Sequence, residues 1–225
     1  MAEDKYLTKL FCQGLSVPVP LGRVYRPADA LSAPLFAGPY FVKDRSGAGS
    51  EGIFVDNLQS DWAGARRIVE RFTNAGKDAL VEAYCPGIDV TVPVIGHAPY
   101  SVLGYVTPRS DKLGSIVTED LKLTDHLGYE MVDVDGMTEA IREDIDKIWT
   151  TAGPMDYFRV DYRIDFVTGQ RRLLELNLCC YIGESGAITL AGEQHGFSKN
   201  DILAHVVEYS LKRQVGSRKH CQWVL

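Results

Sequence analysis

The sequence predicts an α+β fold, because helix and strand patterns do not alternate strictly along the chain. Two strand patterns, at 79–84 and 89–96, follow each other without a helix between them. Two more form a hairpin at 157–177, where apolar and polar residues alternate on both sides of a turn at Thr168-Gly169. A doubly wound parallel sheet, which needs a helix between successive strands, is therefore not expected.

The composition is that of an ordinary globular protein, with 45% apolar and 24% charged residues among 225. This length allows one domain or two small ones. The formal net charge of −6 argues against a nucleic-acid partner, and no apolar run is long enough to span a membrane. The first residues, MAEDKYLTKLF, lack a signal-peptide pattern. We therefore expect a cytoplasmic protein with no nucleic-acid and no membrane partner.

The five cysteines are odd in number and lack the C-x-x-C spacing of zinc or redox sites. Reduced thiols fit this pattern. The adjacent Cys179 and Cys180 have two interpretations, a redox-active pair or two buried thiols at the end of a strand, and the second is favoured.

The first half of the chain contains two helix patterns and four extended segments. In order, these are a helix at 4–13, an extended segment at 22–26, a strand at 40–43, a helix at 61–75 and strands at 79–84 and 89–96. The apolar side of the first helix consists of Tyr6, Leu7, Leu10 and Phe11. The second helix has Ser60 or Asp61 as its N-cap and Gly76 after its end, with an inward stripe of Trp62, Ala65, Ile68, Val69 and Phe72.

A glycine- and serine-rich loop, RSGAGSEGIFVD, follows the strand that ends at Lys43. It has three glycines and two serines within seven residues, so its backbone N–H groups are free to approach an anion such as phosphate. It matches neither common phosphate-binding pattern, since we expect a strand rather than a helix at 53–55. A plain hairpin connection is the alternative, and the lysine that ends the preceding strand favours phosphate binding.

The second half continues with a polar, irregular stretch at 107–129, which is long enough to be an active-site loop. A helix at 138–151 then has an inward side of Ile141, Ile145, Ile148 and Trp149. The hairpin at 157–177 follows, and after it a glycine-rich loop at 183–196. A last helix, capped by Ser198, has an apolar side of Ile202, Leu203, Val206 and Tyr209. The basic tail at 216–225 is expected to be frayed.

The hairpin at 157–177 carries one charged face. Alternation buries one side, formed by Phe158, Val160, Tyr162, Ile164, Leu174, Leu176 and Leu178. The other side presents Arg159, Asp161, Glu175 and Asn177, together with Arg163 and Asp165, which we interpret as structural along with Tyr162. Carboxylate and amide oxygens suit Mg²⁺, and an arginine suits a phosphoryl group. A half-buried hairpin that shows its charged face to water is the alternative.

Five motifs in a fixed order carry a resemblance to a known family: FVKD, AGSEGI, LVEAYCPGIDVTV, FRVDYRID and LLELN. The chain resembles the ATP-grasp carboxylate–amine ligases over residues 4–207, most closely the ATP-binding half of D-alanine–D-alanine ligases. The resemblance implies an ATP-grasp fold, in which two α+β subdomains grip the nucleotide. The implied subdomains are 1–95, with the phosphate loop and a lid at 15–95, and 96–215, with the metal-binding hairpin.

The resemblance also implies roles for individual residues. The ATP phosphates would be contacted by Lys5, Lys43 and the closing loop 46–53, through Gly49, Ser50 and Gly52. The adenosine would be held by the Glu82 side chain at the adenine amino group, the backbone of Tyr84 and Cys85 at the base edge, and Asp89 at the ribose hydroxyls. Two Mg²⁺ ions, for which Mn²⁺ could substitute, would be bound by Asp161, Glu175 and Asn177. The groups acting on the transferred phosphoryl would be Arg159, Lys43 and Ser50, and Lys122 would contact phosphate or substrate. Without the order of motifs, Glu82 and Asp89 would be surface charges at strand ends.

The implied reaction is ATP-dependent activation of a carboxylate as an acyl phosphate, followed by attack of an amine to form an amide or peptide bond. Amino acids or peptides are the expected substrates. The alternative is a non-catalytic nucleotide-binding or regulatory subunit that acts with a partner protein.

The chain departs from the D-alanine ligases in two ways. It begins almost where their ATP-binding half begins, so a partner protein, a second copy of the chain or an open site would replace the missing wall, unless the sequence is a fragment. After Asn177 it reads LCCYIGESGAI without the family's Pro-Gly, which argues against D-alanyl-D-alanine as the product. Backbone N–H groups at 183–186, as a nest or helix start beside Ser185, could take a substrate carboxylate.

Overall fold

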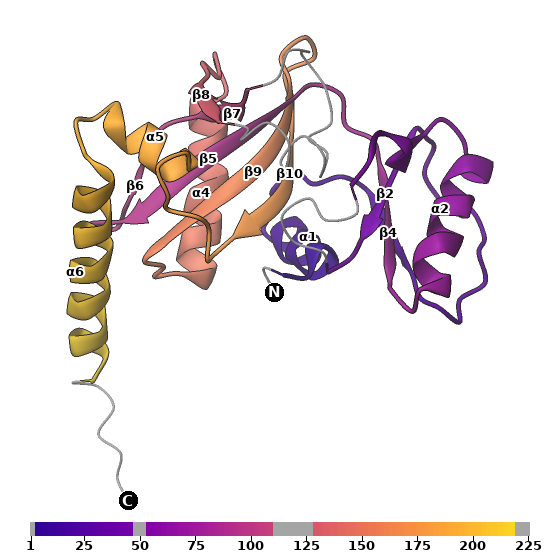
Figure 1. The fold of residues 1–225 in the computed structure, drawn as a ribbon, viewed down its shortest axis with the longest axis horizontal. Coiled ribbons are helices and arrows are strands. Elements are labelled where there is room, and N and C mark those ends of the chain that lie inside the picture. Colours follow the sequence, from indigo (N-terminus) through magenta and orange to yellow (C-terminus); the bar gives the residue numbers. More distant parts are fainter. Residues whose placement is uncertain (1–2, 47–52, 110–127, 219–225) are drawn as a thin grey trace, which may run out of the picture. The chain divides into compact units, whose positions relative to one another are not determined.

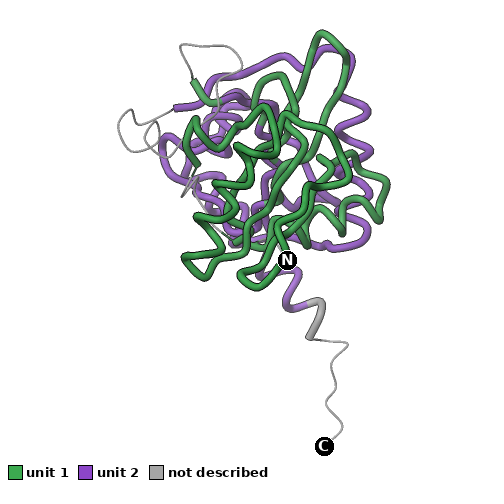
Figure 2. The backbone as a smooth tube through the Cα atoms, turned by 90° about the vertical axis from the view of Figure 1, so that its right-hand side faces the viewer, with its two compact units in different colours: residues 1–90, 108–127, 161–176 green, residues 91–107, 128–160, 177–225 purple. Residues whose placement is uncertain are grey.

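The computed structural model describes residues 3–46, 53–109 and 128–218 and has the predicted α+β architecture (Figure 1). The chain divides into two compact units, coloured separately in Figure 2. The first consists of residues 1–90, 108–127 and 161–176, and the second of 91–107, 128–160 and 177–225. The residue ranges expected for the two ATP-grasp subdomains stay a prediction.

The first unit contains a four-stranded antiparallel sheet covered by one helix. The strands are β1 (Gly22–Tyr25), β2 (Tyr40–Asp44), β3 (Leu58–Gln59) and β4 (Ala79–Ala83), in the order β1-β4-β2-β3. Helix α2 (Trp62–Asn74) begins at Asp61, whose side chain accepts a hydrogen bond of 2.8 Å from the Gly64 N–H. Its predicted inward stripe is confirmed, because Ala65, Ile68, Val69 and Phe72 are buried with sheet residues in one apolar core.

The prediction of a strand at 53–55, after the glycine-rich loop, was wrong. A 3₁₀ turn, η1 (Val55–Asn57), leads directly into the short strand β3. The Asn57 N–H donates to the Phe54 carbonyl at 3.0 Å, which closes the turn. Phe54 and Val55 are 38% and 70% exposed, so their apolar side chains line no sheet face.

The second sheet has the order β10-β9-β5-β7-β8, with β6 paired to β5. Its strands are β5 (Ile88–Gly96), β6 (Tyr100–Val102), β7 (Val106–Pro108), β8 (Tyr129–Met131), β9 (Tyr157–Asp165) and β10 (Gln170–Asn177). The predicted hairpin is confirmed as β9 and β10, and Gly169 has a positive φ of 68° in its turn. Strand β8 was not predicted; it ends the stretch expected to be irregular, most of which lies outside the described residues.

The inward side of β9 follows the alternation, since Phe158, Val160, Tyr162 and Ile164 are all fully buried. The alternation fails on β10, where Leu173 and Leu176 are fully buried and Leu174 is only half-buried. The Leu173 N–H donates to the Pro18 carbonyl at 2.8 Å. The segment at Pro18 therefore lies alongside Leu173, a residue that the sequence pattern assigns to the solvent side.

The second unit contains the helices α4 (Thr138–Ala152), α5 (Ala187–Glu193) and α6 (Lys199–Arg218). The inward side of α4 is as predicted, with Ile141, Ile145 and Ile148 fully buried. The glycine-rich stretch 183–196 was predicted to be a loop throughout, and α5 corrects this. A Cβ at Gly192 would overlap the side chain of Ile202, so the absence of a side chain at this glycine lets α5 pack closely against α6.

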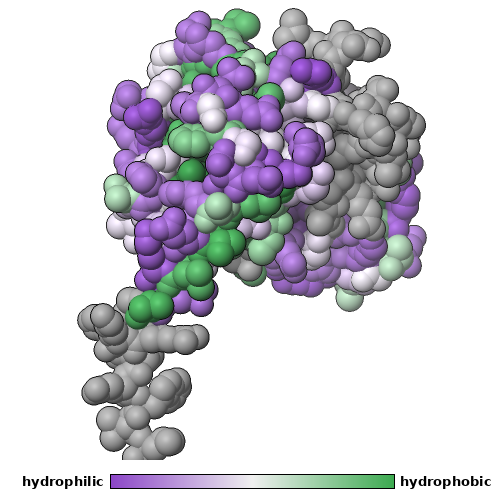
Figure 3. Space-filling model, turned by 60° about the vertical axis from the view of Figure 1, so that its left-hand side comes forward, coloured by the Kyte–Doolittle hydropathy of each residue, from purple (hydrophilic) through white to green (hydrophobic). Residues whose placement is uncertain are grey.

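Helix α6 is apolar on two sides. Its predicted cap is confirmed, since the Asp201 N–H donates to Ser198 Oγ at 3.2 Å, and Ile202 and Val206 are buried. Leu203, which the sequence places on this helix, is 38% exposed. An exposed row at four-residue spacing contains Leu203, Val207, Leu211 and Val215 (Figure 3).

A frayed tail was expected from residue 216, but helix α6 continues to Arg218. Residues 219–225 lie outside the described part. Among the described helices, none combines the length and apolar character needed to cross a bilayer. The described cysteines are free thiols, and Cys179 is exposed while Cys180 is buried, so only one of this pair fits the predicted burial.

Candidate functional site

Helix α1 (Lys5–Gly14) turns lysines rather than its leucines inward. Asp4 caps it by accepting hydrogen bonds of 3.0 Å from the N–H groups of Tyr6 and Leu7. Lys5 and Lys9 are only 6% and 3% exposed, whereas Leu7 is 45% exposed. The apolar side predicted for this helix was therefore wrong. Long charged side chains are rarely buried without a compensating partner, so the buried side of α1 points to a site.

A buried carboxylate, Glu82, lies between Lys9 of helix α1 and Lys43 of strand β2. Lys9 Nζ is 2.7 Å from Glu82 Oε1, and Lys43 Nζ is 2.9 Å from Oε2. The sheet register explains the second pair, because Phe41 lies opposite Glu82 and Lys43 stands two residues further along β2, on the same face. Lys9 also donates to the Leu174 carbonyl at 2.8 Å.

Glu82 Oε1 keeps unused capacity as an acceptor. It is fully buried, and no donor from the described residues is directed at it with hydrogen-bond geometry, although Lys9 Nζ lies close enough for a strong charge attraction. A carboxylate oxygen can accept more than one hydrogen bond, so the Lys9 ammonium at 2.7 Å leaves room for another donor. The oxygen therefore fits an added N–H donor, such as an exocyclic amino group.

The lysine cluster formed by Lys5, Lys9 and Lys43 titrates unlike exposed lysines. Burial lowers the pKa of Lys9 to about 8 and also lowers the pKa of Lys5. Burial opposes the charge of Lys43 as well, but Glu82 and Glu175 outweigh it and raise the pKa of that lysine. Burial likewise acts to raise the pKa of Glu82, and Lys43 and Lys9 outweigh it, so the net pKa is lowered. Three buried lysines thus lie near Glu82, and Asp44 and Glu175 also act on Lys5. A group of buried cations of this kind suits an anion.

Two further carboxylates, Asp161 and Glu175, lie on the adjacent strands β9 and β10, in the parts of these strands that belong to the first unit. Both are half-buried. Glu175 acts electrostatically on Lys5 and Lys43, and both carboxylates raise the pKa of Asp89, after the larger effect of burial. The structure thus brings together predicted phosphate, metal and ribose residues of this unit. Arg159 and Asn177 belong to the second unit, on β9 and β10.

Asp161 and Glu175 are the described carboxylates that were predicted to bind a metal ion. Within the described ranges, no three Asp, Glu, His or Cys side chains are grouped closely enough to hold a metal ion. Two carboxylates without a third suit Mg²⁺, which keeps waters and takes one or two carboxylates plus substrate phosphates, better than a metal that needs a full cage of protein ligands. Asp161 and Glu175 fit that pattern.

The turn after β4 carries the residues predicted to read the base. The Tyr84 N–H already donates to the Pro39 carbonyl at 2.9 Å. Among the described residues, nothing accepts from the Cys85 N–H and nothing donates to the Tyr84 carbonyl. One free donor and one free acceptor on adjacent residues match the requirements of a purine edge.

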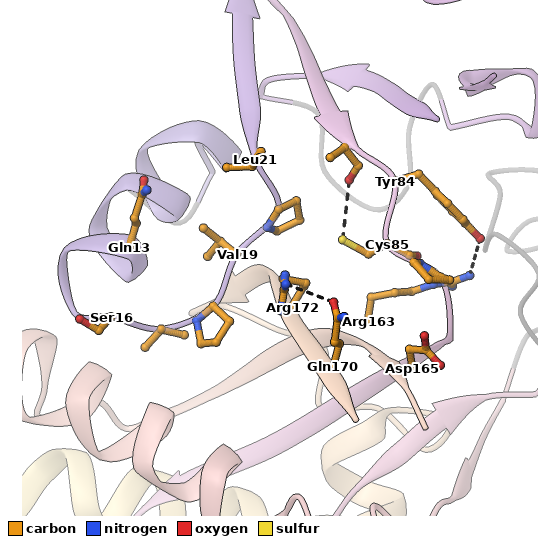
Figure 4. A pocket seen from close by; sticks show the side chains of 15 residues that line it. Gln13, Ser16, Val19, Leu21, Tyr84, Cys85, Arg163, Asp165, Gln170 and Arg172 are labelled. Carbon is orange, nitrogen blue, oxygen red and sulfur yellow. Dashed lines mark hydrogen bonds between the residues drawn. The ribbon is translucent and has the colours of Figure 1, made fainter. Parts of the chain in front are cut away.

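A pocket of about 630 Å³ lies beside this turn (Figure 4). Its walls come from the segment 16–21, the turn 83–86 and the hairpin strands, which contribute Arg163 and Arg172. Figure 4 shows Arg163 reaching from β9 toward Tyr84, whose hydroxyl it contacts at 3.3 Å. The volume is that of a small-molecule site.

Several predicted residues lie outside the described part of the chain, namely Gly49, Ser50, Gly52 and Lys122. The turn at 183–186 is described. Gly186 is the residue before α5, and its N–H donates to the Gly183 carbonyl at 2.8 Å. That this segment takes a substrate carboxylate stays a prediction.

Comparison with known proteins links this geometry to one group of enzymes. No protein-family model matches the chain. The D-alanine–D-alanine ligase of Maridesulfovibrio salexigens is 24% identical over 177 residues, which are 78% of this chain and 57% of the ligase. The D-alanine–D-alanine ligase of Alkalilimnicola ehrlichii is 24% identical over 219 residues, 95% of this chain and 67% of the ligase.

Solved structures give the same result. D-alanine–D-alanine ligase from Bacillus anthracis, complexed with ATP, superposes with a TM-score of 0.74 at 15% identity and covers 96% of this chain and 68% of that one. The chain has an ATP-grasp fold. The ligase from Coxiella burnetii has a TM-score of 0.74 at 16% identity, covering 97% of this chain and 59% of that one.

The resemblance to the ATP-binding half of D-alanine–D-alanine ligases is therefore confirmed at the level of fold and sequence. The chain spans between 57% and 67% of the length of these two curated relatives. Identity is low throughout, and individual residue roles are not carried by the comparisons.

Two residues of this ATP-grasp site were missed by sequence reasoning. Lys9 could have been found from the sequence, because it follows Lys5 by four residues and so lies on the same side of α1. Arg163 was interpreted as structural, although it stands two residues after Asp161 on the same face of β9.

Proposed function

We propose that the protein is an ATP- and Mg²⁺-dependent ligase that activates a carboxylate as an acyl phosphate and joins it to an amine. The observation that carries the proposal is the lysine cluster around Glu82 in an ATP-grasp fold, with Glu175 acting electrostatically on Lys5 and Lys43 and Asp161 on the adjacent strand. A cluster of buried lysines next to carboxylates that suit Mg²⁺ is what a nucleoside triphosphate requires.

The nucleotide would be read along the first unit. Lys5 and Lys43 would contact its phosphates as point charges, together with the loop at 46–53. The Glu82 oxygen without a directed donor would accept from the adenine amino group, and the turn at Tyr84-Cys85 would pair with the base edge. Asp89 would take the ribose hydroxyls.

Asp161, Glu175 and Asn177 would hold the metal. When bound, Mg²⁺ would neutralise charge on the phosphates, and the carboxylate and amide oxygens are the ligands that it accepts. Arg159 would contact the transferred phosphoryl group through a planar guanidinium, which matches phosphate oxygens in a bidentate geometry.

The chemistry follows from these contacts. A substrate carboxylate oxygen attacks the γ-phosphorus, the bond to the β-phosphate oxygen breaks, and ADP leaves. An amine then attacks the acyl carbon and loses a proton, and inorganic phosphate leaves as the amide forms. Lys43 and Arg159 would stabilise the charge that develops on the phosphoryl oxygens. Catalysis in this scheme rests on positioning and electrostatics.

Amino acids or peptides are the substrate class that we propose, because the chain is similar to D-alanine–D-alanine ligases. The stretch after Asn177 supports a different product, since it has LCCYIGESGAI in place of the Pro-Gly of those enzymes. The backbone N–H groups at the start of α5, beside Ser185, would take the carboxylate of the acceptor. Unchanged acceptor affinity in Ser185→Ala would count against that placement.

The test is nucleotide-dependent stabilisation. A non-hydrolysable ATP analogue at a hundred times its Kd, with Mg²⁺, should add about 2.7 kcal/mol to the free energy of unfolding. Asp161→Asn and Glu175→Gln should remove the Mg²⁺-dependent part of the shift, while leaving the stability without ligand close to wild type. The readout is thermal or urea unfolding with and without each ligand.

Asp165→Asn is the matched control, because Asp165 lies on the same strand as Asp161, at the hairpin turn. The bonds that its side chain makes among the described residues are local, to Val167 and Thr168. It should keep the full Mg²⁺-dependent shift. A wild-type protein that shows no shift at millimolar nucleotide and Mg²⁺ would rule the proposal out.

A further inference from the structure

Arg163 is a buried cation that the proposed reaction does not use. Its side chain is 5% exposed and reaches from β9 toward the turn after β4. It makes an ion pair with Asp89, Nη1 to Oδ1 at 3.0 Å. Its Nε donates to the Cys85 carbonyl and its Nη2 to the Tyr84 hydroxyl, both at 3.3 Å.

The partners of Arg163 are the residues that the proposed function assigns to adenosine. Tyr84 and Cys85 form the turn that would read the base edge, and Asp89 would take the ribose hydroxyls. The guanidinium also lies 5.9 Å from the centre of the Tyr84 ring, within the range of a cation–π contact. One side chain thus joins both parts of the adenosine site.

We propose that Arg163 is the positioning residue of this site, which holds Asp89 and the Tyr84-Cys85 turn in the arrangement that binds the adenosine of ATP. The proposal rests on the proposed function. It does not require Arg163 to touch the nucleotide.

The shape of the guanidinium suits this role. Its five N–H donors lie in one plane and point in fixed directions, so a single arginine satisfies three partners at once, which a lysine cannot do with the same geometry. Burial makes each contact stronger and its loss more costly. The three partners are thereby fixed relative to β9 before any nucleotide arrives.

A second observation shows that the same segment is pressed against β9. Gly87, two residues after Cys85, has a positive φ of 111°, and a Cβ there would overlap the carbonyl oxygen of Ile164. Ile164 is the residue next to Arg163. The turn therefore approaches β9 as closely as a backbone can, which brings Tyr84, Cys85 and Asp89 within reach of one arginine.

Charge gives Arg163 a further effect on Asp89. Burial raises the pKa of the Asp89 carboxyl, and Asp161 and Glu175 add to the rise, while Arg163 opposes it. Without Arg163 the carboxyl would take up a proton more readily and would accept hydrogen bonds from ribose hydroxyls less well. Loss of Arg163 should therefore weaken nucleotide binding more at low pH than at high pH.

The test compares ATP with 2′-deoxy-ATP and 3′-deoxy-ATP, each with Mg²⁺, by calorimetry on the full chain. For the wild type, one deoxy analogue should bind at most threefold more weakly than ATP, and the other should bind about tenfold more weakly. A tenfold loss of affinity is what one hydrogen bond to a charged group contributes. Arg163→Met should bind ATP about tenfold more weakly and should lose most of its preference for the missing hydroxyl. A side chain that only supported the fold would not alter that preference selectively.

Arg172→Met is the matched control. Arg172 lines the same pocket from β10, and within the described residues its guanidinium bonds the Arg171 carbonyl and Gln170 Oε1. It should keep both affinity and hydroxyl preference. Arg163→Lys keeps the charge and provides a milder variant if Arg163→Met does not fold; it should restore less than half of the lost preference.

Two outcomes would overturn the inference alone: wild type that binds ATP without any hydroxyl preference, or Arg163 variants that weaken all three nucleotides equally. Failure of wild type to bind ATP would instead reject the proposed function, and the inference with it.

Discussion

Glu82 shows how a single residue combines structure and function. Its carboxylate is 2% exposed in the middle of β4, where an apolar side chain would ordinarily stand. Lys9 and Lys43 make this burial tolerable by supplying opposite charge at 2.7 Å and 2.9 Å. An apolar triad would be at least as stable, so the charges indicate a requirement other than stability.

Lys9 gives the residue-scale prediction. Its pKa is lowered to about 8, against 10.5 for an ordinary lysine. Between these values the unfolded state binds more protons than the folded state, so this group makes stability rise with pH. The wild-type free energy of unfolding, minus that of Lys9→Met, should increase by roughly 2–3 kcal/mol from pH 7.5 to pH 10.5. Urea unfolding at the two pH values measures it.

Lys77→Met provides the control, since the Lys77 side chain is 47% exposed and pairs with Asp44 at 2.9 Å. Its difference from wild type should not rise with pH. A Lys9→Met difference that stays constant or falls would show that the ammonium is not strained by burial.

At the scale of elements, close approach between the turn 84–87 and β9 depends on Gly87. Gly87→Ala places a Cβ onto the Ile164 carbonyl at a positive φ, and neither backbone can move without disturbing the sheet. We expect a loss of about 3 kcal/mol or more in the free energy of unfolding, from overlap added to backbone strain. Urea unfolding compares it with wild type.

Gly169→Ala measures the contribution of backbone strain alone to the loss in the free energy of unfolding. Gly169 also has a positive φ, 68°, but a Cβ there would meet nothing within 4 Å. Its loss should be about 1 kcal/mol. Equal losses at both positions would contradict the close packing of the turn on β9.

At the scale of the whole molecule, the two candidate functions differ in turnover rather than in binding. The ligase should release ADP and phosphate when ATP, Mg²⁺ and the correct acid and amine are present. Arg159→Ala should lower this rate by about 100-fold or more while changing ATP affinity only a few-fold, because its contact is needed chiefly in the transition state. Coupled detection of ADP over a panel of amino acids and dipeptides measures the rate.

Arg142→Ala, an exposed position on α4, should leave that rate unchanged. Mg²⁺-dependent ATP binding without ADP release for any acid and amine, alone or with a partner protein, would favour the non-catalytic nucleotide-binding subunit.

The sequence by itself determined most elements and the order of the site residues. Local patterns are sufficient for this: Asp61 caps α2, Ile141, Ile145 and Ile148 repeat at helical spacing on α4, and Phe158 to Ile164 alternate on β9. The motifs that contain Lys43, Glu82, Asp161 and Glu175 indicated an ATP-grasp ligase before any contact was known. Each of these signals lies within a few residues along the chain.

Tertiary structure alone decided which face of an element is buried when polarity and burial disagree. Helix α1 buries Lys5 and Lys9 because Glu82, more than seventy positions away, compensates their charge. Leu173 is fully buried although the alternation assigns it to the solvent side, and its backbone pairs with the distant Pro18. Arg163 looked like one more charge on an alternating strand, and only the fold brings Asp89 and Cys85 to its guanidinium. Long-range pairing of charges is invisible to local patterns, and the proposed chemistry depends on it.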